Sequence, residues 1–147
     1  MATSKTSKKA AKSRVVDKGE KAAIELIARH RRALPALHAA ARGAAERLHR
    51  DRVLQAGSIV LNSGSGAGGF LLKSSEGGVE LQPLEAGAET ASARIEVTCD
   101  PARLASIIEG KKDARMQFFA GGIRVRGDMA YLSEIGLRLG FLDRPLI

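Results

Sequence analysis

The segment MQFFAGGIRVRGD, residues 116–128, decides how this chain folds. Two adjacent aromatic residues lead into the Gly121–Gly122 pair. Residues 123–126 then alternate between apolar and basic side chains, which is the pattern of a half-buried strand. Asp128 follows the strand and is a suitable N-cap for a final helix. The segment therefore predicts a strand followed by a capped helix, and it contains no pattern typical of a catalytic centre.

The predicted final helix has a single apolar stripe. Its large apolar side chains recur at spacings of three and four, which is the period of a helix with one buried face. These residues are Met129, Leu132, Ile135, Leu139 and Leu142.

Four segments upstream have the composition of strands, at residues 58–62, 70–74, 79–84 and 92–98. Short glycine-rich joints separate the successive segments, so the pattern predicts an antiparallel meander. In the fourth segment the apolar side chains fall at alternate positions and are expected to face inward. These inward residues are Ala93, Ile95, Val97 and Cys99.

The first joint contains Gly64, Gly66 and Gly69, which match the spacing of a dinucleotide-binding loop. That motif holds a pyrophosphate at the N-terminus of the helix that follows it. A strand pattern follows here instead, so we interpret the joint as a hairpin loop. The sequence therefore predicts no nucleotide cofactor, and no other cofactor is indicated.

Helices are predicted on both sides of the strands. Asp100 as N-cap and Pro101 at the first helical position begin one helix, and residues 114–119 form another helical turn. Residues 17–52 have helical periodicity, and either two short helices or one helix kinked at Pro35 would fit them.

The net charge of +8 is concentrated at one end of the chain. Residues 1–52 carry +9, whereas residues 53–147 carry −1. Residues 1–16 contain too little apolar surface to offset the entropy of ordering, so they are predicted to form a disordered basic tail. Such a tail either only solubilises the chain or is attracted to an anionic partner, which can be a lipid surface, nucleic acid or an acidic protein. Transient contact with an anionic membrane surface is the specific prediction. The residues assigned to such contact are Lys5, Lys8, Lys9, Lys12 and Arg14.

Several classes of function are disfavoured. One cysteine excludes an internal disulfide, and no secretory signal or apolar run of roughly 20 residues is present, so a cytoplasmic protein is expected. His30, His38 and His49 are not spaced as metal ligands and are interpreted as surface residues. Cys99 has no neighbouring base, and no nucleophile–base pair is visible, so no catalytic residue is assigned. The aromatic content of 3% argues against base stacking on nucleic acid.

The order of these elements resembles the sterol carrier protein 2 (SCP-2-like) lipid-binding domain family. The matching text is ARIEVTC, then DPARLASIIEGKKDARMQFFAGGIRVRGD, then MAYLSEIGLRLGFL. The resemblance implies an α+β fold in which a five-stranded, mainly antiparallel sheet is covered on one face by helices that enclose an apolar tunnel. The family-like domain is placed at residues 53–147, with its first helix within residues 35–52.

The resemblance also implies a function. Such domains lack catalytic residues and hold fatty acyl, sterol or isoprenoid chains, so the leading hypothesis is a lipid-binding or lipid-transfer protein. The alternative is a protein-interaction module that keeps this fold and uses the basic N-terminal helices to bind a partner. The residues assigned to the tunnel wall are Phe118, Phe119, Ile123, Val125, Met129, Leu132, Ile135, Leu139 and Phe141.

Overall fold

The computed structural model describes the backbone of residues 2–51, 57–75 and 78–146, and the side chains of residues 18–49, 57–74 and 78–146. Its central element is a five-stranded sheet in the order β3-β2-β1-β4-β5. The strands are β1 (Gly57–Asn62), β2 (Gly69–Ser75), β3 (Gly78–Leu84), β4 (Ile95–Thr98) and β5 (Arg124–Gly127).

Three of the four strand pairings, β1–β2, β2–β3 and β4–β5, are antiparallel, and β1–β4 is parallel. The predicted five-stranded, mainly antiparallel sheet is therefore confirmed, but the predicted meander is wrong at the fourth strand. Pro83 lies inside β3 and has no N–H to donate, so β3 suits a sheet edge. In β1, Ile59 to Leu61 are all buried, and this strand accordingly has a neighbour on each side.

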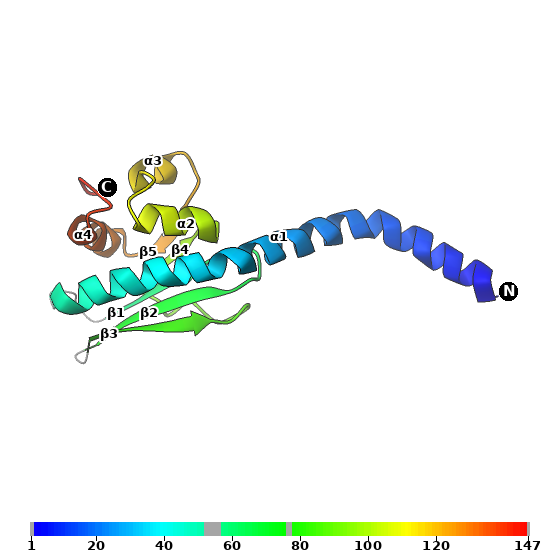
Figure 1. Cartoon of the computed structure of the whole chain (residues 1–147), viewed down its shortest axis with the longest axis horizontal. Helices are drawn as coiled ribbons and strands as arrows, with labels where there is room; N and C mark the ends of the chain where they lie inside the picture. The colour runs from blue at the N-terminus through cyan, green and yellow to red at the C-terminus, as the bar shows by residue number, and fades with distance from the viewer. Residues whose placement is uncertain (1, 52–56, 76–77, 147) are drawn as a thin grey trace.

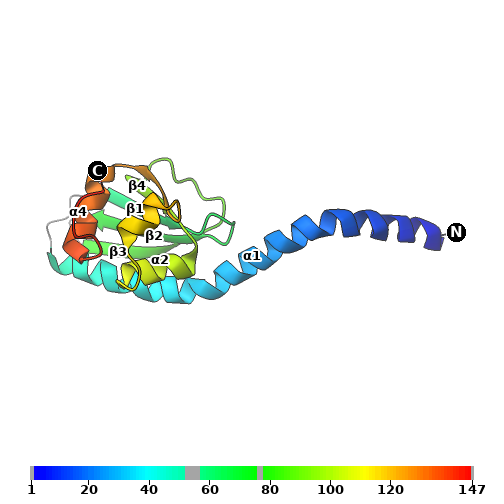
Figure 2. The same ribbon diagram turned by 90° about the horizontal axis from the view of Figure 1, so that it is seen from above.

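Four helices pack on one face of the sheet (Figures 1 and 2). They are α1 (Ala2–Asp51), α2 (Pro101–Ile108), α3 (Ala114–Phe119) and α4 (Met129–Leu139). The predicted caps of α2 and α4 are confirmed. The carboxylate of Asp100 accepts the N–H of Ala102 at 2.9 Å, and that of Asp128 accepts the N–H of Tyr131 at 3.0 Å. Among the described residues, no helix combines the length and the apolarity that a bilayer crossing requires.

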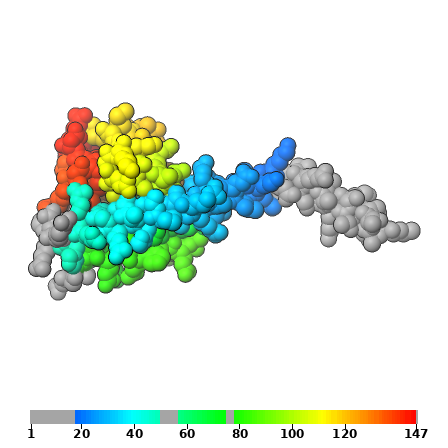
Figure 3. All heavy atoms as spheres, in the orientation of Figure 1, coloured from blue at the N-terminus to red at the C-terminus, as the bar shows by residue number. Residues whose placement is uncertain are grey.

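Helix α1 is a single helix that contains Pro35, so the two-helix alternative is excluded. The helix continues to Ala2, across the residues expected to be disordered, because residues 2–18 contain no Gly or Pro to end it and several good helix formers. Its C-terminal half lies along the sheet and α2, whereas its N-terminal half projects away from the rest of the chain (Figure 1). Figure 3 shows the C-terminal half of α1 packed against the other elements.

The core fills the space between sheet and helices. Three of the four inward positions predicted for the fourth strand are confirmed, since Ile95, Val97 and Cys99 are all buried. Ala93 is half-buried and lies before β4 begins. Gly69 begins β2 and pairs with Asn62 across the first hairpin. A side chain at Gly69 would collide with the carbonyl oxygen of Leu61. This glycine is therefore explained by the close approach of two strands.

Candidate functional site

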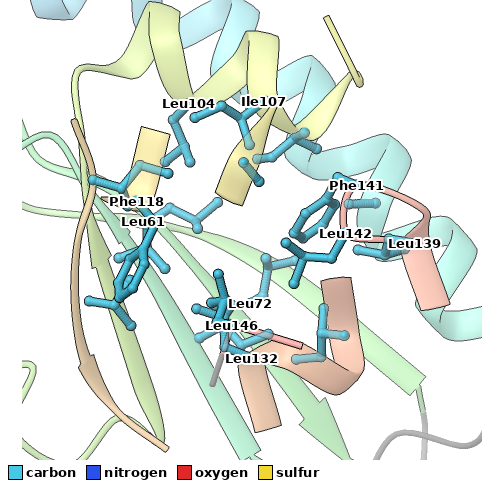
Figure 4. Close-up of a pocket in the computed structure, with 18 of the residues that line it drawn as sticks. Leu61, Leu72, Leu104, Ile107, Phe118, Leu132, Leu139, Phe141, Leu142 and Leu146 are labelled. Carbon is cyan, nitrogen blue, oxygen red and sulfur yellow. The ribbon is translucent and has the colours of Figure 1, made fainter. Parts of the chain in front are cut away.

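A cavity of about 80 Å³ lies between the sheet and the helices, and the side chains labelled in Figure 4 converge on it. Each of its nineteen lining residues is apolar, so its wall offers no side-chain charge, hydroxyl or amide to a ligand. From the sheet side come Ile59, Leu61, Leu72, Val97, Ile123 and Val125. From the helices come Ala44, Leu48, Leu104, Ile107, Ile108, Ala114, Phe118, Leu132, Ile135 and Leu139, and from the C-terminal segment Phe141, Leu142 and Leu146.

The C-terminal segment closes one side of the cavity by folding back over α4. The left-handed conformation of Gly140 ends the helix, and the N–H of Leu142 then bonds to the carbonyl of Gly136 at 3.0 Å. A side chain at Gly136 would collide with that of Leu142, so glycine permits this close packing. The buried hydroxyl of Ser133 accepts the N–H of Leu146 at 3.0 Å, which fixes a second point of the segment.

The cavity is shielded unevenly. Most of its wall is buried, but Phe118 of α3, Val125 of β5, Ile108 at the end of α2 and Phe141 of the C-terminal segment are only half-buried. Two of these, Phe118 and Val125, belong to the α3 and β5 side of the wall. The cavity is therefore closest to solvent where α2, α3, β5 and the C-terminal segment form its wall.

Seven of the nine residues assigned to the tunnel wall line this cavity: Phe118, Ile123, Val125, Leu132, Ile135, Leu139 and Phe141. The other two do not. Met129 is half-buried outside the lining, and Phe119 is 63% exposed on the surface of α3. Adjacent residues of a helix point about 100° apart, so Phe118 and Phe119 cannot both face inward. That the seven residues bind lipid remains a prediction.

Twelve lining residues were not assigned from the sequence. The strand residues among them include Leu61 and Leu72, which lie in the consecutive apolar runs 59–61 and 70–72. Alternation does not show which side chains of such a run face the cavity. Ala44 and Leu48 lie on the apolar side of α1, but the sequence could not show that α1 packs beside α2 and α4. Leu146 follows the last helix and carries no periodic signal, so the fold-back of the C-terminal segment could not be predicted.

His30 corrects the interpretation of the histidines as surface residues, because it is only 6% exposed. Its Nδ1 lies 2.6 Å from Ser65 Oγ, and its Nε2 lies 3.4 Å from Asp100 Oδ2. Arg29 approaches the same carboxylate at 3.6 Å. This cluster ties α1 both to the β1–β2 loop and to the N-terminus of α2.

Ser65, His30 and Asp100 are the residue types of a hydrolase catalytic triad, but here they have structural roles. Burial opposes ionisation of Asp100, yet hydrogen bonds from the N–H groups of Arg103 and Ala102, with the charges of His30 and Arg29, lower the pKa of Asp100. This carboxylate is the N-cap of α2, and the imidazole is enclosed by the packing of α1. We therefore interpret the trio as a structural junction.

Other reactive groups among the described residues also have structural surroundings. Burial is the main cause that raises the pKa of the Cys99 thiol to about 11, so it stays protonated and unreactive near neutral pH. No cluster of three or more metal-ligating side chains occurs in the part of the chain that the structure describes. The side chains of Lys5, Lys8, Lys9, Lys12 and Arg14 lie outside the described ones, so their assigned role stays a prediction.

Comparison with known proteins gives one family match. The model of the SCP-2 sterol transfer family matches residues 34–136. No curated protein matches the chain.

Solved structures give likenesses at low sequence identity. The inverting sec-alkylsulfatase Pisa1 from Pseudomonas sp. aligns with a TM-score of 0.52 at 21% identity over 67% of this chain. This chain spans only 15% of the length of that protein, so the likeness concerns the fold of one part. Sterol carrier protein 2 from Yarrowia lipolytica aligns with a TM-score of 0.42 at 20% identity, over 78% of this chain and 87% of its own.

Proposed function

This chain belongs to the SCP-2 sterol transfer family, and we propose on that premise that it is a non-catalytic lipid carrier of the cytoplasm. Its ligand is a fatty acyl, sterol or isoprenoid chain held in the cavity between sheet and helices. The observation that carries the proposal is the uniformly apolar lining of that cavity. No cofactor takes part, and no bond of the ligand is changed.

The energetics of such a site depend on apolar burial alone. Each methylene transferred from water to an apolar wall contributes about 0.8 kcal/mol, before the cost of ordering the ligand. A lining without polar groups cannot distinguish ligands by hydrogen bonding. The carrier should therefore select by length and thickness of the chain and accept several chemical classes.

The cavity must widen to take a whole lipid chain. Its volume of about 80 Å³ is below the roughly 300–1,000 Å³ of small-molecule sites. The C-terminal segment is the part best suited to move, because Phe141, Leu142 and Leu146 enter the wall from outside the regular elements. We propose that this segment shifts outward as the ligand enters.

The test is a binding titration with a fluorescent fatty acyl probe. The unmodified chain should bind the probe saturably, and Leu132→Arg should abolish binding because it places a charge in the apolar wall. Leu137→Arg is the matched control, since Leu137 belongs to the same helix but is 41% exposed. The control should bind the probe as the unmodified chain does.

A second variant covers the case in which Leu132→Arg does not fold. Ala44→Leu replaces a methyl group of the cavity wall by a larger apolar group, which fills space without introducing charge. It should fold and bind the probe more weakly. Absence of saturable binding by the unmodified chain to acyl, sterol and isoprenoid probes would refute the proposal.

A further inference from the structure

Helix α3 exposes apolar side chains that the lipid cavity does not use. Met116 is 69% exposed and Phe119 is 63% exposed, and they lie three residues apart, on the same side of one helical turn. Among the described residues, five large apolar side chains are exposed, and two of the three that exceed 60% occur on this six-residue helix. Figure 1 shows α3 as the part of the helical layer farthest from the sheet.

Charged side chains surround this pair. A shallow surface hollow is lined by Met116 and Phe119 together with Asp113, Arg115, Asp143 and Arg144. The guanidinium of Arg115 lies 5.0 Å from the centroid of the Phe119 ring. The carboxylate of Asp113 accepts a hydrogen bond from the backbone N–H of Met116 at 3.0 Å. The rim thus carries two arginines and two aspartates, whose charges balance, and both arginines lie beside the two accessible apolar side chains.

The exposed pair is continuous with the lipid cavity. Phe118 and Ala114 of the same helix line that cavity, and the rings of Phe118 and Phe119 meet edge to face with centroids 5.3 Å apart. One face of α3 is therefore cavity wall, and the other is molecular surface. A partner that contacts Phe119 on the outer face is therefore separated from the cavity by the side chain of Phe118.

The small contact area that Met116 and Phe119 offer indicates what kind of partner they bind. A stable protein interface buries about 800 Å² on each partner and involves roughly 20–30 residues a side, which two side chains cannot supply. Binding at a membrane interface needs a smaller contact area. A few apolar side chains can enter the boundary below the headgroups while basic neighbours contact the phosphates. Two exposed apolar side chains with arginines at their base fit the second case.

We propose that Met116 and Phe119 dock this chain on the surface of a phospholipid bilayer. They enter the boundary between headgroups and acyl chains, and Arg115 and Arg144 pair with lipid phosphates. Docking places the α3 wall of the cavity against the membrane. The inference rests on the proposed function only in taking the membrane as the source of the lipid ligand. Membrane binding through α3 can be measured whether or not the chain carries lipid.

The first experiment uses Phe119→Trp in the full chain. The sequence contains no Trp, so the new indole is the sole tryptophan reporter. On vesicles of pure phosphatidylcholine its emission should shift to the blue, and lipids brominated on their acyl chains should quench it. Leu137→Trp is the matched control, because Leu137 is exposed on α4 outside this hollow, and its emission should not change.

The second experiment measures sedimentation with phosphatidylcholine vesicles at high salt, where a basic tail contributes little. The double variant Met116→Ser/Phe119→Ser should bind at least about tenfold more weakly than the unmodified chain, since even partial burial of two large apolar side chains contributes that much. Its affinity for the acyl probe in solution should be unchanged, since neither residue lines the cavity.

The outcomes separate the two proposals. A blue shift at Phe119→Trp and weaker sedimentation of the double variant support docking through α3. An unshifted Phe119→Trp, an equal shift of Leu137→Trp, or undiminished sedimentation of the double variant overturns it, even if the acyl probe binds. Vesicle binding through α3 without any binding of the acyl probe instead refutes the carrier function and leaves the docking surface standing.

Discussion

The two halves of helix α1 have the same regular backbone but very different surroundings. In the C-terminal half, Leu37 and Ala41 are completely buried and Leu48 is 3% exposed. In the N-terminal half, Ile24 is 64% exposed and Leu26 is 37% exposed. Tertiary packing therefore stabilises one half, whereas local propensity and the continuity of the helix sustain the other.

The largest difference between the halves is expected from truncating one apolar side chain in each. Leu37→Ala should lower the free energy of unfolding by about 2–5 kcal/mol, because it leaves a cavity in the core. Ile24→Ala should change it by less than about 0.5 kcal/mol. Chemical denaturation of both variants measures this, and equal losses would mean that the N-terminal half is packed as well.

The next effect concerns His30, where the exposed half of α1 meets the folded core. His30→Ala removes the contacts with Ser65 and Asp100 and leaves their polar groups without this partner, so we expect a loss of about 1–3 kcal/mol. Arg31→Ala, at the exposed neighbouring position, is the control. If both variants melt at the same temperature, the His30 cluster does not hold α1 in place.

A smaller effect is expected from the charge of Asp100. Because its pKa is lower in the folded chain than the ordinary 3.8, its stabilising contribution is complete above pH 3.8. The contribution is lost as the pH falls through the folded-state value. Asp100→Asn keeps an oxygen for the cap of α2 and should cost less than about 1 kcal/mol at neutral pH.

The direction of the pKa shift of Asp100 can be checked by measuring the free energy of unfolding as the pH is lowered. The variant should lose less stability than the unmodified chain as the pH is lowered below 3.8. Asp143→Asn, at an exposed position outside this cluster, should follow the unmodified curve. A steeper acid loss in Asp100→Asn would contradict the assigned direction of the pKa shift.

The smallest effect on stability is expected from deleting residues 2–14. The N-terminal end of α1 projects away from the sheet (Figure 2), so the melting temperature should be nearly unchanged. Sedimentation with anionic vesicles at low salt should nevertheless fall, because five basic residues are removed and each contributes on the order of 1 kcal/mol at such a surface. Unchanged binding would exclude these residues as the anionic contact.

The fold could be predicted where local patterns are strong. Alternation gave the inward face of β4, and Asp100 and Asp128 marked the starts of α2 and α4 because a carboxylate can accept the free N–H groups of a first turn. The pairing of β4 with β1 could not be predicted from alternation. Alternation shows which side chains lie on the same face of a sheet, but not which strands are adjacent. Pro83 suits the edge position of β3 because it has no N–H to donate, but this position was not predicted from the sequence.

The cavity wall was predictable only in part for a similar reason. Leu132, Ile135 and Leu139 share a stripe whose period is visible in the chain. The opposite wall comes from β1, β2 and α1, which approach α4 only through tertiary packing. His30 was misjudged because its burial depends on Ser65 and Asp100, which are distant in sequence.

The parallel pairing of β1 with β4 has a consequence for the route of folding. The antiparallel neighbours β1 and β2, and likewise β2 and β3, are separated by only a few residues of sequence, so these pairings close small loops. Pairing Ile59 with Ile95 instead encloses both hairpins, and the larger loop has a higher entropic cost. We expect this closure to be the slow event, so that truncating Ile95 retards refolding, whereas truncating Val79 on the edge strand mainly accelerates unfolding.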